Sequence, residues 1–112
     1  MDSKVKIKLG NDGFWFFGPG VCQLLRHIDE TGSVASASLA MGLSYSKAWK
    51  MLRDSENGLK CPLVERKSGG KGGGKATLTD KARRLIDLFE KLESDVDDYT
   101  RERIGKLEEE FE

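Results

Sequence analysis

The 112-residue sequence contains few of the residues that catalytic and metal sites require. It has two cysteines, Cys22 and Cys61, and a single histidine, His27. Two isolated cysteines do not form a disulfide framework, and Cys22 lies in an apolar helical pattern that favours a small buried side chain. One histidine with no cysteine or second histidine around it supplies neither a zinc site nor a histidine-based triad. We therefore expect no cofactor, no metal and no enzymatic activity.

The sequence also lacks a long apolar run. No stretch approaches the roughly 18 apolar residues of a membrane-spanning helix, and residues 1–10 contain no apolar block of the signal-peptide kind. Hydrophobic residues make up 38% of the chain and charged residues 34%, which is typical of a globular protein with a strongly ionic surface. We therefore expect one domain with a projecting element, in the cytoplasm and with no membrane partner.

An excess of either charge is absent from the whole chain but present in its parts. The 19 basic and 19 acidic residues give a net charge of zero. Residues 1–81 carry 13 Lys/Arg and 8 Asp/Glu, a net +5, whereas residues 82–112 carry 6 and 11, a net −5. This distribution favours a polyanionic partner for the basic part and a solvated helix for the acidic part.

Hydrophobic spacing and capping residues predict a mainly helical chain with small β elements. Alternation over residues 4–9 predicts a strand, and spacings of three and four between apolar residues predict helices. The helices begin at a proline or after a serine or threonine cap, and Gly58 is expected to end the third. The expected elements are a hairpin over 4–17, helices over 19–32, 34–41 and 45–57, strands over 63–67 and 76–78, and a helix from 80 onward. The tight turn at 41–44 makes the second and third helices a helix-turn-helix.

The helix expected over residues 45–57 has two different faces. One has the spacing of an apolar stripe that packs on a core. Its members are Tyr45, Ala48, Trp49 and Leu52. The opposite face is polar and basic, as in helices that enter the major groove of B-DNA. Its members are Ser46, Lys47, Lys50 and Arg53, with Ser44 and the Tyr45 hydroxyl at the helix start. The alternatives are a solvated basic face and, for Trp49, a base-stacking role.

The strand–loop–strand over residues 63–78 predicts a β-wing. Its loop, SGGKGGGK over residues 68–75, interleaves glycines with lysines, and glycines let backbone N–H groups approach phosphates closely. The alternative is a hairpin loop with no role. The spacing Gly69-x4-Gly74-Lys75 is similar to the start of a P-loop, but Ala76 stands where a magnesium-binding hydroxyl belongs. We therefore do not expect nucleotide hydrolysis.

The last helix is longer than a small domain needs. From residue 80 to residue 110 it would extend about 46 Å at roughly 1.5 Å per residue. Its apolar residues follow a heptad-like seam whose first turns are expected to pack on the chain's own core. No other segment is expected to cover the seam beyond residue 92, so a second copy of the chain is the expected partner. The dimerisation residues are Leu85, Phe89, Leu92, Val96 and Tyr99.

Four segments together carry a family resemblance. They are residues 28–34 (IDETGSV), 42–49 (GLSYSKAW), 62–67 (PLVERK) with the glycine-rich loop, and 76–79 (ATLT). Residues 20–95 thereby resemble the N-terminal winged helix-turn-helix domain of ModE-type molybdate-responsive transcription regulators, which are more distantly related to LysR-type domains. The resemblance implies a dimer on a palindromic operator. Because no oxyanion-binding domain follows, the chain resembles a stand-alone DNA-binding form, and molybdate is not expected to bind it.

The sequence therefore predicts a winged helix-turn-helix protein, α+β with most of its residues helical, that binds double-stranded DNA as a homodimeric transcription regulator. We expect residues 1–78 to form the DNA-binding domain and residues 79–112 the dimerisation helix. The expected DNA-binding residues are Ser33, Ser44, Tyr45, Ser46, Lys47, Lys50, Arg53, Arg66, Lys67, Lys71, Gly72, Gly73, Gly74 and Lys75. The alternative is a winged-helix module that binds another protein and not DNA.

Overall fold

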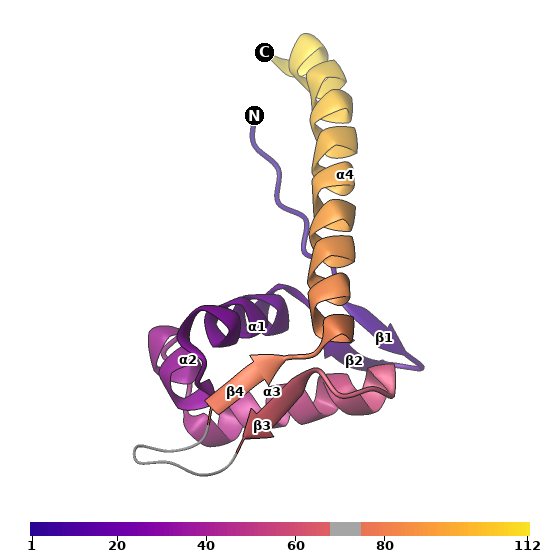
Figure 1. Cartoon of the computed structure of the whole chain (residues 1–112). Coiled ribbons are helices and arrows are strands. Elements are labelled where there is room, and N and C mark those ends of the chain that lie inside the picture. The colour runs from indigo at the N-terminus through magenta and orange to yellow at the C-terminus, as the bar shows by residue number, and fades with distance from the viewer. Residues whose placement is uncertain (68–74) are drawn as a thin grey trace.

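The computed structural model describes residues 1–67 and 75–112 (Figure 1). Within them the elements in chain order are β1 (Leu9–Asn11), β2 (Phe14–Phe17), α1 (Pro19–Thr31), α2 (Val34–Ala40), α3 (Tyr45–Leu59), β3 (Val64–Lys67), β4 (Lys75–Leu78) and α4 (Asp80–Phe111). The predicted class, an α+β winged helix-turn-helix with a hairpin before it and a long helix after it, is confirmed.

The N-terminal hairpin is shorter than predicted. β1 and β2 are antiparallel, and Asp12 and Gly13 both adopt positive φ in the turn between them, which is the backbone of a tight hairpin turn. β2 has four residues and α1 follows almost at once, so residues 4–8 have no strand to pair with. The strand predicted over residues 4–9 is therefore wrong except at Leu9.

The N-terminal segment, residues 1–8, runs instead beside α4 (Figure 1). The Met1 ammonium group lies 3.2 Å from a carboxylate oxygen of Glu108, near the far end of that helix. Val5 and Ile7 line a small cavity with Val96, so part of the seam on α4 faces this segment. The expectation that no other segment covers α4 beyond residue 92 is therefore wrong.

The helix-turn-helix forms as its caps predict. Backbone amides at the starts of α2 and α3 donate to the Ser33 and Ser44 hydroxyl oxygens, each over 3.1 Å. Gly42 adopts φ 67° between the two helices, a conformation that favours glycine. These residues fix the direction in which α3 leaves the turn.

α3 continues past the position predicted for its end. It ends at Leu59, with Lys60 at φ 58° as its cap, so the prediction that Gly58 closes the helix is wrong. Gly58 is needed for packing instead, since a Cβ at this position would overlap the ring of Phe16. The Ser55 hydroxyl, buried one turn earlier, donates to the Phe16 carbonyl. α3 and β2 are thus in direct contact.

The first turns of α4 belong to the hydrophobic core. The Thr79 hydroxyl oxygen accepts from the Ala82 amide and caps the helix as predicted. Ala82, Ile86 and Phe89 are buried, and the Phe89 ring stacks on Phe17 with centroids 5.0 Å apart. The remainder of α4 projects from the core, which gives the molecule extents of 62 × 29 × 23 Å (Figure 1).

Cys22 lies in this core, as its apolar surroundings in the sequence predict. Its residue is 5% exposed, and burial, with a smaller contribution from Glu90 and Glu93, raises the pKa of its thiol to about 11. The side chain is therefore a neutral thiol at neutral pH and packs as a small apolar group.

Candidate nucleic-acid interface

The outer face of α3 is basic, as predicted. Ser46, Lys47, Lys50 and Arg53 are all exposed, whereas Ala48 and Leu52 on the inner face are fully buried. The Lys50 ammonium group lies 2.9 Å from a carboxylate oxygen of Asp54, one turn further along. Lys50 must therefore exchange this exposed ion pair for any contact with a phosphate or base, which costs little at a solvated position.

Tyr45 and Trp49 depart from the predicted core stripe. Tyr45 is 46% exposed, so its expected place in the core is wrong. Its ring lies at the surface, at the start of α3. Trp49 is half-buried, and the Arg66 guanidinium carbon lies 4.8 Å from its ring centroid in a cation–π arrangement. Arg66 also donates to the Tyr45 hydroxyl over 3.4 Å. Arg66 of the wing is thereby held against α3.

The strands of the wing carry exposed cations, of which Arg66 contacts α3. Arg66, Lys67 and Lys75 are all exposed, and Lys67 and Lys75 face each other across the antiparallel pair β3–β4. Like charges directly opposite each other on a sheet repel, and a bound anion would relieve that repulsion. The predicted contacts at Lys71, Gly72, Gly73 and Gly74 lie outside the described residues.

Two contacts that the sequence does not predict fix the wing to the helices. The Glu56 carboxylate near the end of α3 accepts from the backbone amides of Leu63 and Val64, over 2.7 and 3.3 Å. The Ala76 amide in β4 donates to the Gly32 carbonyl over 2.8 Å, just after α1. Neither contact has a sequence signal, because a carboxylate and a carbonyl here accept from backbone amides of another element and follow no capping pattern.

The two capping serines lie at helix starts on the helix-turn-helix. Their oxygens already accept from the helix amides, and each hydroxyl hydrogen can still donate to a phosphate oxygen. Ser44 is exposed beside Tyr45 and Ser46, whereas Ser33 is half-buried at the start of α2. The structure therefore brings Ser44 together with the basic face of α3 and leaves Ser33 less accessible.

The predicted dimerisation residues are divided between three environments. Phe89 is 2% exposed and packed in the chain's own core, and Leu85 is partly buried against that core. Val96 is half-buried and lines the cavity beside the N-terminal segment. Leu92 and Tyr99 are 40% and 59% exposed. An unpredicted neighbour, Leu88, is 53% exposed one turn before Leu92.

Residues 1–67 and 75–112 contain no group of three potential metal ligands. In the same ranges, no helix combines the length and the apolar character that crossing a membrane requires.

Helix α3 with an exposed basic face, packed against a basic β-wing, defines a winged helix-turn-helix protein (Figure 1). Residues 21–83 match the model of the bacterial regulatory helix-turn-helix proteins of the lysR family. The chain belongs to this family, whose members are regulators and not enzymes.

The curated relatives agree with the family. The chain is 37% identical over 92 residues to transcriptional regulator ModE of Yersinia pestis, and 36% identical over the same length to the DNA-binding transcriptional dual regulator ModE of Escherichia coli K12. Each match covers 82% of this chain and 35% of the relative. This chain is also 40% identical over 73 residues to the molybdenum-pterin-binding protein MopB of Rhodobacter capsulatus. That match covers 65% of this chain and 27% of MopB. The chain thus spans about a third of the length of the ModE relatives.

Proposed function

We propose that this protein is a transcription regulator that binds double-stranded DNA in the cytoplasm as a homodimer. The observation that carries the proposal is the exposed basic face of α3 beside the exposed cations of the wing. A helix of this kind fits the major groove, where its first turns reach base edges. Arg66, Lys67 and Lys75 then lie where they can contact the flanking backbone, and the lysR-family match supports the same reading.

Within this proposal the residues of α3 have separate tasks. Lys47 and Arg53 have exposed side chains and are the residues we assign to base edges or nearby phosphates. Ser44, Tyr45 and Ser46 at the start of α3 donate to phosphates, because helix starts attract anions. The wing contributes positive charge and contacts with the DNA backbone, and these include the contacts that we propose at residues 71–74.

We propose that the dimer forms through the exposed stripe on α4. Leu88, Leu92 and Tyr99 are exposed at spacings of four and seven residues, which places them on one side of a helix. Phe89 is not part of this surface, because its side chain is already buried within the chain. Residues 1–78 with the first turns of α4 would form the DNA-binding unit, and the rest of α4 the dimer contact. A palindromic operator would then match the twofold symmetry.

The alternative function is a winged-helix module that binds another protein. It is favoured by the acidic surface of α4, since residues 82–112 carry a net −5. In this alternative the basic face of α3 is only solvated. The two readings differ in geometry, because a DNA-binding dimer places its two recognition helices about 34 Å apart, one turn of the duplex.

The experiment that tests the DNA-binding face compares alanine variants at Lys47, Lys50 and Arg53 on a selected operator and on random duplex. If the replaced residue reads bases, its alanine variant should bind the operator about 1–3 kcal/mol more weakly than wild type, and random duplex should show a smaller loss. Lys91→Ala is the matched control, because Lys91 is an exposed lysine of α4 that pairs with Asp95. Equal losses on both duplexes would remove base reading, and no loss at any position would remove the interface.

A further inference from the structure

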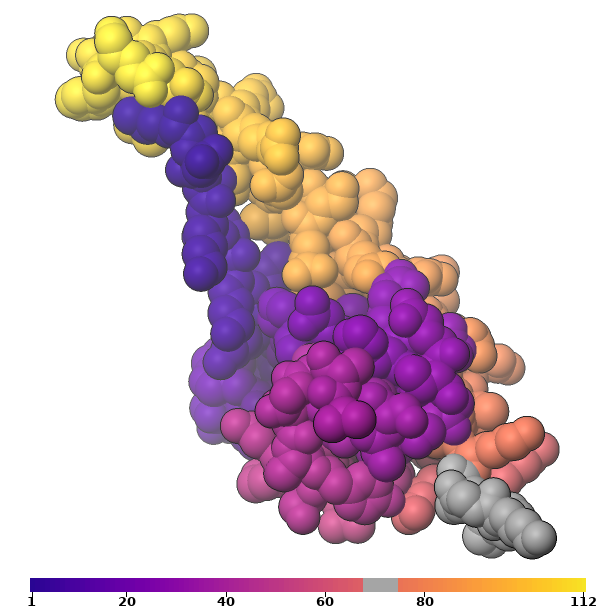
Figure 2. All heavy atoms as spheres, turned by 90° about the vertical axis from the view of Figure 1, so that its left-hand side faces the viewer, coloured from indigo at the N-terminus to yellow at the C-terminus, as the bar shows by residue number. Residues whose placement is uncertain are grey.

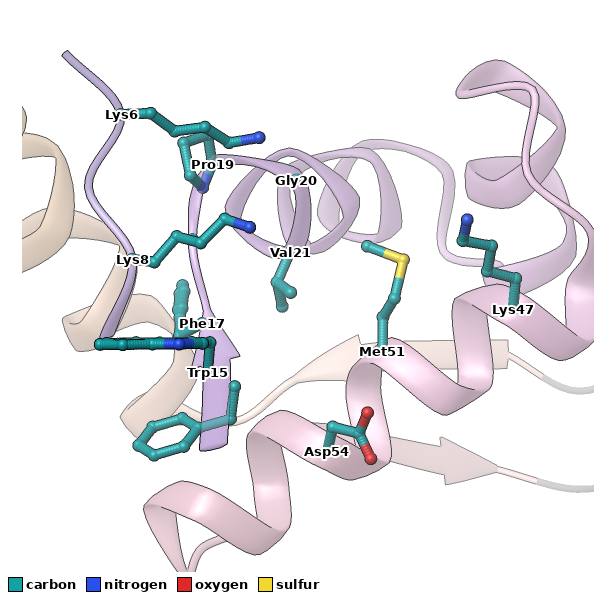
Figure 3. Close-up of a pocket in the computed structure, with 12 residues that line it drawn as sticks. Lys6, Lys8, Trp15, Phe17, Pro19, Gly20, Val21, Lys47, Met51 and Asp54 are labelled. Carbon is teal, nitrogen blue, oxygen red and sulfur yellow. The ribbon is translucent and has the colours of Figure 1, made fainter. Parts of the chain in front are cut away.

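A cavity of about 410 Å³ lies between the N-terminal segment, the start of α1 and one side of α3 (Figure 3). Three lysines line it: Lys6 and Lys8 from the N-terminal segment, and Lys47 from α3. In Figure 3, Lys6 and Lys8 extend over the start of α1, and Lys47 stands on α3 beyond Met51. The cavity therefore joins a residue of the proposed recognition helix to a part of the chain that the proposed function leaves without a role.

The charge of the cavity is positive and largely unpaired. Among the described residues, no carboxylate lies within 4.0 Å of the ammonium groups of Lys6, Lys8 or Lys47. The one acidic residue of the lining, Asp54, is engaged by Lys50. Three lysines without a carboxylate partner, drawn from two distant segments, make the local potential positive and attract an anion.

The start of α1 makes the same site hospitable to an anion. The cap residue, Gly18, offers no side-chain hydrogen bond, and the first turn carries no acidic residue. Pro19 has no N–H, so the free amides of this helix start are those of Gly20 and Val21, both of which line the cavity beside Met51. Free amides at a helix start favour negative charge, which adds to the attraction of the three lysines.

The position of the cavity relative to α3 indicates which anion would occupy it. In Figure 2 the N-terminal segment lies on one side of the helix-turn-helix and the wing lies on the other. A duplex held against α3 would therefore continue past the recognition helix in both directions, toward the wing on one side and toward Lys6 and Lys8 on the other. The backbone phosphates are the anions that such a duplex presents.

We propose that this cavity binds a phosphate group of the DNA backbone at the edge of the segment that α3 contacts, on the side away from the wing. Lys6 and Lys8 hold the phosphate from the N-terminal segment, and Lys47 holds it from α3. The N-terminal segment thereby acts as a second clamp on the DNA backbone, on the side opposite the wing. The proposal rests on the proposed function and adds to it a contact region, a length requirement for the duplex and a role for residues before β1.

The test compares wild type, Lys6→Ala/Lys8→Ala and Lys4→Ala by fluorescence anisotropy on a labelled duplex across a salt series. Lys4 is the matched control, since it is an exposed lysine of the same segment that does not line the cavity. The double variant should bind several-fold more weakly and lower the salt slope by about 1 to 2, because each phosphate contact contributes about 0.9. Lys4→Ala should keep the wild-type slope. All three side chains are exposed, and equal thermal melting checks that the fold is retained.

A second arm separates a DNA phosphate from a free one. Inorganic phosphate is titrated into the protein alone while the amide resonances of Gly20 and Val21 are followed by NMR. Two results together would assign the cavity to free phosphate and overturn the DNA contact. The first is chemical-shift changes at millimolar phosphate that the double variant lacks, and the second is a salt slope of DNA binding that the double variant leaves unchanged. On a duplex shortened so that it ends before the phosphate at Lys6 and Lys8, wild type should bind as weakly as the double variant.

The outcomes distinguish this inference from the function on which it rests. If wild type binds DNA and the double variant matches it in affinity and in salt slope, the clamp is overturned and the proposed function is retained. Wild type that binds no DNA at low salt overturns the proposed function and the clamp together.

Discussion

Gly58 lies near the end of α3, directly against the ring of Phe16 in β2. A glycine inside a helix normally costs about 1 kcal/mol relative to alanine, so its presence needs a compensating contact. Here the compensation is the close approach of α3 to β2, which the buried hydrogen bond from Ser55 to the Phe16 carbonyl also supports. The glycine is therefore a packing residue, although its place near a helix end makes it look like a cap.

Gly58→Ala should lower the free energy of unfolding, because overpacking typically costs about 1–3 kcal/mol and exceeds the gain in helix propensity. Gly105→Ala is the matched control, since Gly105 is also helical and a Cβ there would meet no atom within 4 Å. Thermal unfolding should show a lower midpoint for the first variant and a slightly higher one for the second. An increase of the midpoint in both variants would contradict the packing role.

At the same scale, single residues mark the limits of what the sequence predicts. Local chemistry alone predicts Ser33, Ser44 and Thr79 as caps, and each accepts the expected amide hydrogen bond. Glu56 gave no such signal, because its partners are backbone amides of Leu63 and Val64. Capping within one turn is visible in the order of residues, whereas a side-chain contact with the backbone of another element is not.

Among the elements, α4 combines two environments along one helix. Its first turns are packed in the core through Ala82, Ile86 and Phe89, and its exposed stripe begins at Leu88 on another side. Heptad spacing predicted the helix and an apolar seam, but spacing does not say which partner covers each residue. Spacing therefore does not predict that Val96 faces the N-terminal segment. The same ambiguity makes residues 4–8 look like a paired strand, although they pair with none.

Leu92→Glu and Tyr99→Glu should each convert the proposed dimer to monomer, because a carboxylate would have to be buried without a partner in the contact. Both side chains are exposed in the single chain, so the fold itself should be retained. Ser94→Glu introduces the same charge at an exposed position about half a turn away and should leave the dimer intact. Sedimentation equilibrium distinguishes the states, and dimers that persist in both glutamate variants would exclude this stripe as the interface.

For the whole molecule, the charge distribution follows the shape. The basic residues of α3 and the wing lie at the core end of a structure 62 Å long, and the acidic residues 82–112 form most of α4, which projects from that core (Figure 1). A net charge of zero is therefore compatible with a polyanionic partner, because binding depends on the local field. The acidic helix is held away from the surface proposed to meet DNA.

The central claim is that this surface binds double-stranded DNA, and one measurement tests it most directly. Wild-type protein is titrated into a labelled random duplex of about 30 base pairs, roughly three helical turns, at several salt concentrations. We predict binding at low salt, with log K falling against log salt at a slope of about −4 or steeper, as expected for two protomers that each contact several phosphates. No binding at low salt, or binding independent of salt, would contradict it and favour a protein partner for this face.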